Sequence, residues 1–176
     1  KAGYTDDVHR LAPADSAGRN RERPMKLAEA LLERKSLKEK IESLRARLGE
    51  NVMVQEGDKP SEDPRLLMSE LDDAVEALEK LIKQINATNN SAQLADGLSV
   101  SEAIVRRDML RLRRETLDQV AQSASVRQNR YMRTEVRFVP TIDNAELRKQ
   151  IDGLAKSWRE LDAQIQAVNW TTELAT

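Results

Sequence analysis

The stretch LRKQIDGLAKSWRELDAQIQAV, residues 147–168, decides the fold class of this chain. Its large apolar residues recur every three or four positions, so they share one face of an α-helix and leave the other faces to polar side chains. Just before it, Asp143 and Glu146 have the cap-to-acid spacing of a helix start. The pattern predicts a long amphipathic helix. Its apolar seam consists of Leu147, Ile151, Leu154, Trp158, Leu161, Ile165 and Val168.

Three further segments carry a similar pattern. One predicted helix covers residues 27–48 with Gly49 as its C-cap, and another covers residues 64–86 after the turn-rich EGDKPSEDP. A third follows the capping box Ser99-Val-Ser-Glu102 and continues to about residue 124. Long helices of matched length joined by modest loops predict a mainly all-α fold, either an antiparallel four-helix bundle or coiled-coil hairpins.

Two short segments predict β structure. Residues 51–55 (NVMVQ) are rich in β-branched side chains, and residues 134–139 (TEVRFV) alternate polar and apolar residues. Two lone strands are marginal by themselves. We therefore expect them to pair antiparallel as a small two-stranded β-ribbon at one end of the helices.

The first 24 residues differ from the rest of the chain. They are polar, rich in Arg, Asp, Gly and Pro, and without periodicity, whereas the helical pattern opens at Met25. We expect residues 1–24 to be an irregular N-terminal extension or a non-native start, and residues 25–176 to form a single helical domain. The alternative is an arm that docks on a neighbouring subunit.

The residue types that usually carry catalysis are scarce. The chain has no cysteine and a single histidine, His9, which excludes thiolate zinc sites, Glu-x-x-His di-metal sites and Cys-His pairs. It also lacks GxxxxGK[ST] and GxGxxG phosphate loops. We expect no enzyme, no cofactor and no metal, with Ser-Lys or purely carboxylate catalysis left open because serines and acids are plentiful.

We expect a cytoplasmic protein, because the chain has no cysteine and its N-terminal stretch lacks the apolar run of a signal peptide. The 29 basic and 30 acidic residues leave a formal charge of −1, so no global field attracts nucleic acid or an anionic membrane. No run approaches the roughly 18 consecutive apolar residues of a spanning helix, and the mean hydropathy is −0.66.

Arginines gather in the third predicted helix and in the segment after it. They could form a basic surface for nucleic acid or lipid, a solvated face that pairs with the acidic second helix, or an inter-subunit contact. The near-neutral net charge and the lack of interleaved aromatic residues favour the solvated face. Trp170 lies outside the seam of the last helix and is a tail anchor or an interface residue. The candidate interface or anion-binding residues are Arg106, Arg107, Arg111, Arg113, Arg114, Arg130, Arg133 and Trp170.

Several segments, taken in order, resemble the septicolysin family of small actinobacterial helical proteins. The resemblance lies in MKLAEALLERKSLKEKI at 25–41, VQEG at 54–57, INATN at 85–89, RYMRTEVRFVPTID at 130–143 and NWTTEL at 169–174. It covers nearly all of the chain after residue 24 and implies a membrane-acting, pore-forming cytolysin.

The residues themselves favour a different hypothesis. Heptad-spaced seams, absent metal ligands and balanced charge are typical of a non-enzymatic, self-associating helical scaffold or interaction protein, and we expect a homo-oligomer. The cytolysin implied by the resemblance is the alternative. Nucleic-acid binding through the arginine-rich helix is the second alternative.

Overall fold

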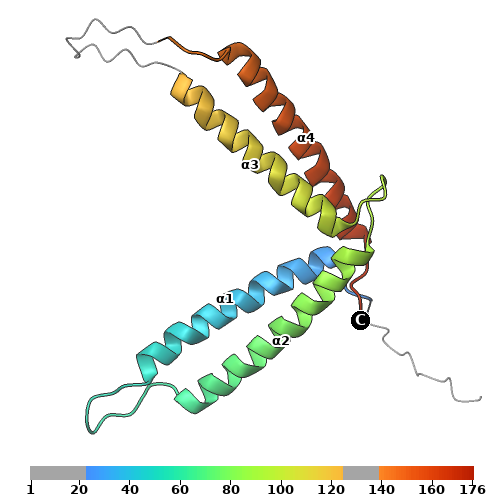
Figure 1. Ribbon diagram of the computed structural model, residues 1–176. Helices are drawn as coiled ribbons and strands as arrows, with labels where there is room; N and C mark the ends of the chain where they lie inside the picture. The colour runs from blue at the N-terminus through green and yellow to red at the C-terminus, as the bar shows by residue number, and fades with distance from the viewer. Residues whose placement is uncertain (1–22, 125–138) are drawn as a thin grey trace, which may run out of the picture.

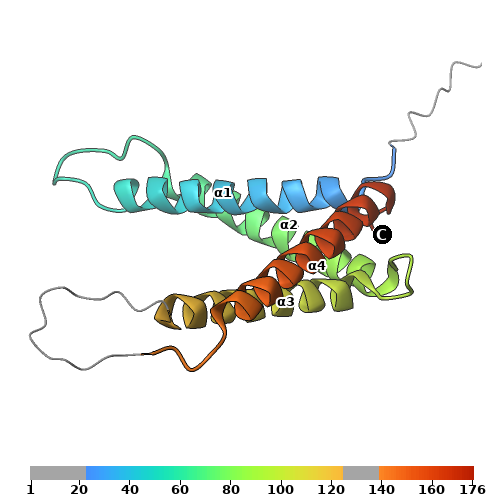
Figure 2. The ribbon, with the colours of Figure 1, turned by 90° about the horizontal axis from the view of Figure 1, so that it is seen from above.

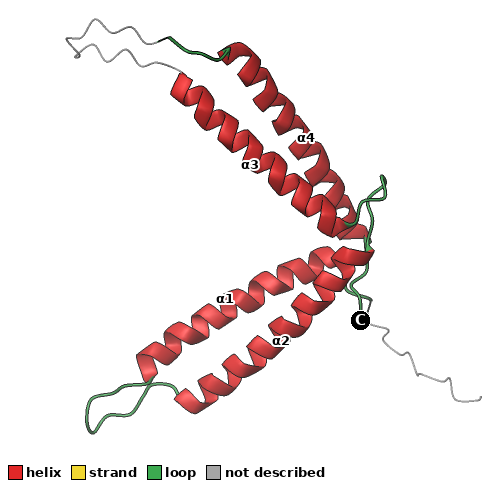
Figure 3. Cartoon of the chain, in the orientation of Figure 1, coloured by secondary structure: helices red, strands yellow, loops and turns green. Residues whose placement is uncertain are grey.

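A computed structural model of the chain describes residues 23–124 and 139–176. These residues contain four long helices and no strand (Figure 3). The helices are α1 (Leu27–Asn51), α2 (Pro64–Ser91), α3 (Val100–Ala124) and α4 (Asn144–Thr171). The predicted all-α fold class is confirmed.

The helix starts follow the capping signals in the sequence. At the start of α3, the Ser99 backbone N–H and hydroxyl donate to Glu102 Oε2 at 2.9 and 2.7 Å, and the Glu102 N–H donates to Ser99 Oγ at 3.2 Å. At the start of α4, Asp143 Oδ1 accepts from the backbone N–H groups of Ala145 and Glu146. These bonds satisfy N–H groups that have no partner inside the first turn.

Two helices continue past their predicted ends. Gly49 lies inside α1 and is not its C-cap, and α2 extends through the polar NATNNS run as far as Ser91. In that run, the Thr88 hydroxyl donates to the Gln84 carbonyl at 2.8 Å, and the Ser91 hydroxyl donates to the Ala87 carbonyl at 3.1 Å. Side chains that bond back to the preceding turn are compatible with a helix, and the burial of Thr88 favours a helical conformation through this polar run.

The predicted β-ribbon is wrong. Its first strand is absent because Asn51 completes α1, and residues 53–55 belong to the loop that follows. The buried Asn51 side chain donates to the Arg47 carbonyl and accepts from the Ser61 hydroxyl at 2.8 Å and the Glu62 N–H at 2.9 Å. Asn51 therefore ties both ends of the loop together and leaves Val52 and Met53 in solvent. The second predicted strand, residues 134–139, lies almost entirely outside the described residues.

The helices pair as two antiparallel hairpins, which is the second of the two predicted arrangements. α1 packs against α2 and α3 packs against α4, and the two hairpins diverge as the arms of a V (Figure 1). Seen from above, α1 and α3 run on opposite sides of the molecule (Figure 2). Helices from different arms meet only at the vertex.

Each arm buries a single seam with one apolar cluster near the vertex and one farther out. In the α1–α2 arm, Leu27, Ala30, Leu81 and Ile85 form the inner cluster, and Leu44, Leu67 and Ala74 form the outer one. In the α3–α4 arm, the inner cluster is Leu94, Val100, Ala103, Leu161 and Ile165, and the outer one is Ala121, Leu147 and Ile151. In an arm two helices thick, each helix packs against one neighbour along most of its length, so its other faces lie outside the core.

Candidate functional site

The vertex of the V joins the start of α1 to the tail that follows α4. The Leu27 backbone N–H donates to the Thr172 carbonyl at 2.9 Å, and the Leu174 N–H donates to the Met25 carbonyl at 2.8 Å. Leu174 packs against the inner cluster of the α1–α2 arm. Leu174 therefore anchors the tail, whereas Trp170, expected to be a tail anchor or an interface residue, is 58% exposed.

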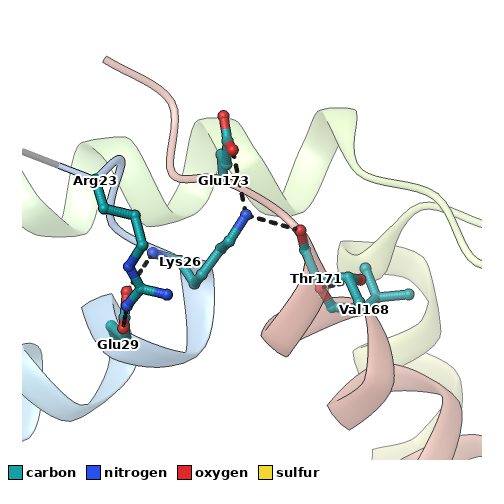
Figure 4. A network of polar contacts seen from close by, with 6 residues as sticks. All are labelled: Arg23, Lys26, Glu29, Val168, Thr171 and Glu173. Carbon is teal, nitrogen blue, oxygen red and sulfur yellow. Dashed lines mark hydrogen bonds and ion pairs between the residues drawn. The ribbon is translucent and has the colours of Figure 1, made fainter. Parts of the chain in front are cut away.

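A polar network surrounds this junction (Figure 4). Lys26 Nζ donates to Glu173 Oε1 at 3.2 Å and to the Thr171 carbonyl at 3.3 Å. The Lys26 backbone N–H donates to Glu29 Oε2 at 2.7 Å, and this bond, together with the nearby Arg23, lowers the pKa of Glu29. Exposed ion pairs contribute little to stability, so the backbone bonds and the Leu174 contact hold the vertex.

The turn between α2 and α3 completes the vertex. Leu94 inserts into the inner cluster of the α3–α4 arm, and the Val100 N–H donates to the Ala92 carbonyl at 2.9 Å. Gly97 adopts a φ of 86° in this turn, a conformation that favours glycine. A short, internally bonded turn fixes the direction in which α3 leaves α2.

The candidate arginines of α3 lie on more than one face of the helix. Arg107 and Arg114, seven residues apart, are half-buried on the side of α4, whereas Arg106 and Arg113, also seven apart, are exposed on another side. Arg111 is also exposed, on the side of Arg107 that faces away from Arg106 and Arg113. The remaining two candidates, at positions 130 and 133, lie outside the described residues. The structure therefore does not gather the α3 arginines into one basic surface.

Arg107 binds within its own arm. Its Nη1 donates to Asp162 Oδ1 on α4 at 3.0 Å, and its Nε and Nη2 donate to Asp108 Oδ1. Although burial acts to lower it, the hydrogen bonds to the two carboxylates raise the pKa of Arg107. This arginine fastens α3 to α4 and is not available as a free anion site.

Sequence reasoning missed an apolar stripe on α3. Val105, Met109 and Leu112 are 61%, 54% and 55% exposed and follow the i, i+4, i+7 spacing of one helix face. At 100° per residue they lie on the far side of α3 from Ala103 and Leu110, which pack toward α4. The signal was present as a second apolar periodicity, but only the structure shows which of the two faces α4 covers.

None of the four helices is both long enough and apolar enough to cross a membrane. The part of the chain that the structure describes also contains no group of three or more His, Cys, Asp or Glu side chains that could hold a metal ion.

Comparisons with known proteins identify a family. Residues 34–174 match the model of the family of unknown function DUF6847, which is most of the chain. The chain belongs to this family. It is also similar to a functionally unknown conserved protein from Corynebacterium diphtheriae, whose crystal structure has a TM-score of 0.81 at 37% identity and covers 87% of this chain and 100% of that one. No curated protein matches the chain.

These matches correct the resemblance drawn from sequence. The family is one of unknown function, and neither it nor the Corynebacterium structure has any link to septicolysin. The five quoted segments are therefore not evidence of a cytolysin.

Proposed function

We propose that this member of the DUF6847 family is a non-enzymatic helical scaffold that works by self-association. The observation that carries the proposal is the V of two arms, each only two helices thick. Among the described residues, sixteen hydrophobic and three polar side chains are buried, which is a small core for helices of 25 to 28 residues. Such arms offer long faces to a partner.

Large apolar side chains outside the seams support the same proposal. Met68 and Val75 on α2 and the stripe on α3 are each between 47% and 61% exposed. Single exposed apolar residues are ordinary, but a row of them along one helix marks an interaction surface.

The experiment is the native mass in solution, measured by light scattering after size exclusion over a range of micromolar concentrations. Self-association predicts a defined multiple of 19.9 kDa that persists on dilution. A strictly monomeric protein of 19.9 kDa at the highest concentration would overturn the proposal.

A second measurement tests whether apolar contacts or charge pairs hold the assembly together. Raising the salt concentration screens charge pairs but strengthens apolar burial, so an assembly built on an apolar face should persist at 1 M salt. Masses that grow without limit as concentration rises would indicate aggregation and would contradict a defined scaffold.

A further inference from the structure

The face of α3 that points away from α4 is unpartnered within the described residues. The stripe formed by Val105, Met109 and Leu112 covers about two helical turns of this face. A shallow hollow of about 340 Å³ adjoins the stripe at the vertex end, lined by Ser101, Glu102, Val105 and Arg106. The stripe and the hollow together present an apolar strip with room for a side chain from a partner.

Charges of opposite sign flank this stripe. At 100° per residue, Arg106 and Arg113 lie along one edge of it, and Asp108 and Glu115 lie along the other. Arg113 and Glu115 form no ion pair within the described part of the chain. Asp108 is 38% exposed although its Oδ1 accepts hydrogen bonds from Arg107. Both edges therefore present charge to a partner helix.

The charges on two copies of this face complement each other only when the two α3 helices run parallel. In a heptad repeat, the residues of the stripe occupy the core positions a and d. Arg106 and Arg113 occupy the e positions, which follow d, and Asp108 and Glu115 occupy the g positions, which precede a. When two copies of α3 pair in parallel, Asp108 of one copy lies against Arg113 of the other, and two-fold symmetry makes this contact twice. An antiparallel pair would place arginines against arginines and acids against acids.

We infer that the occupant of this face is α3 of a second copy of the chain, paired in parallel and in register. The inference rests on the proposed self-association and specifies its interface. The apolar stripe supplies the contact, and the flanking charges select the direction.

Cysteine cross-linking tests the direction of pairing, because the chain has no cysteine of its own. Val105→Cys and Leu112→Cys are made as separate variants and oxidised alone and as an equimolar mixture. In a parallel pair each variant faces its own copy, so each alone gives a disulfide-linked dimer. Mixed dimers should stay rare, because seven residues separate the two sites by about 10.5 Å along the helix, beyond the reach of a disulfide.

An antiparallel pair would give the reverse pattern, with cross-links only in the mixture, and would overturn the inference. Lys156→Cys on the exposed surface of α4 serves as the control and should give no disulfide-linked dimer under the same oxidation. Equal cross-linking of all three variants would show random collision and would also overturn it.

A second set of variants tests the surface by affinity. Leu112→Glu should weaken self-association at least tenfold, while Leu32→Glu, a similarly exposed position on α1, should not. Likewise Arg113→Glu should weaken it, and Arg111→Glu, the same charge change on another face of α3, should leave it unchanged. Circular dichroism confirms that each variant keeps its helices, as expected for exposed positions.

The outcomes distinguish the two proposals. A wild-type multimer that Leu112→Glu and Arg113→Glu leave intact would overturn the α3 interface but keep self-association. A wild-type monomer would overturn both.

Discussion

Gly153 occupies the interior of α4, where no turn or close approach requires a glycine. A Cβ atom there would meet nothing within 4 Å. Gly153→Ala should raise the free energy of unfolding by about 0.5–1 kcal/mol, because alanine loses less backbone entropy in a helix. Urea unfolding followed by circular dichroism measures the change.

Gly97→Ala is the matched control for that substitution. Gly97 has a φ of 86°, so the same added methyl group should lower the free energy of unfolding by about 1 kcal/mol. A higher free energy of unfolding for Gly97→Ala, or a lower one for Gly153→Ala, would contradict the backbone conformations described for these positions.

The side chain of Asn51 fixes the conformation of the loop between α1 and α2. Its buried amide bonds to the Arg47 carbonyl, the Ser61 hydroxyl and the Glu62 N–H. Asn51→Ala should cost about 1–3 kcal/mol, since it leaves polar groups at the α1–α2 loop without their partners. Ser61→Ala, which removes a single donor, should cost less, and equal costs would mean that the amide does not organise the loop.

At the scale of the helix, capping carboxylates connect stability to pH. Hydrogen bonds from the Ser99 hydroxyl and backbone N–H lower the pKa of Glu102 from its ordinary 4.5. A group whose pKa is lower in the folded state contributes stability above its unfolded pKa and loses it as pH falls through the folded pKa. The bond from the Lys26 N–H acts the same way on Glu29, and Arg47 acts so on Glu62.

We therefore expect the melting temperature to hold steady from neutral pH to about pH 5 and to fall below pH 4.5. Thermal melts at half-unit intervals test this. Glu102→Gln should lower the melting temperature at neutral pH and make the acid-induced fall shallower. An unchanged fall in that variant would show that other groups are responsible.

Helix starts were easier to predict than helix ends. Ser99 and Asp143 signal starts through local hydrogen bonds with residues up to three positions away, and both bonds form as the sequence indicates. The ends depend on burial supplied from far along the chain. Thr88, for example, is buried at the vertex, where its hydroxyl accepts from the Ala175 N–H at 2.9 Å.

The candidate site was less predictable than the helices. The arginines of α3 form one cluster in sequence, but helix rotation distributes them over several faces, and α4 takes Arg107 into its own seam. The i, i+4, i+7 spacing of the apolar stripe is visible in the sequence. Whether the stripe is exposed depends on the face of α3 against which α4 packs.

At the scale of the whole molecule, the tail after α4 joins the two arms at the vertex of the V. Removing residues 172–176 deletes the backbone bonds between this tail and the start of α1, together with the Leu174 contact. We expect this truncation to lower stability and to let the arms separate, which small-angle X-ray scattering detects as a larger radius of gyration.

Glu173→Gln is the control for the truncation. It removes only the charged partner of Lys26, in a pair whose glutamate is 59% exposed, and should change little. An unchanged scattering profile after truncation would mean that the α2–α3 turn alone holds the vertex.

The sequence by itself determined the four helices and their starts, because a seam of three-four spacing and a capping side chain act through neighbours along the chain. Only the tertiary structure decided that these helices form two separate arms, that Leu174 and Leu94 close the vertex, and that Val105, Met109 and Leu112 remain outside any core. The physical reason is that an amphipathic helix specifies which face must be buried but not what buries it. That choice is made by contacts between residues far apart in the chain, such as the bond from Leu27 to Thr172.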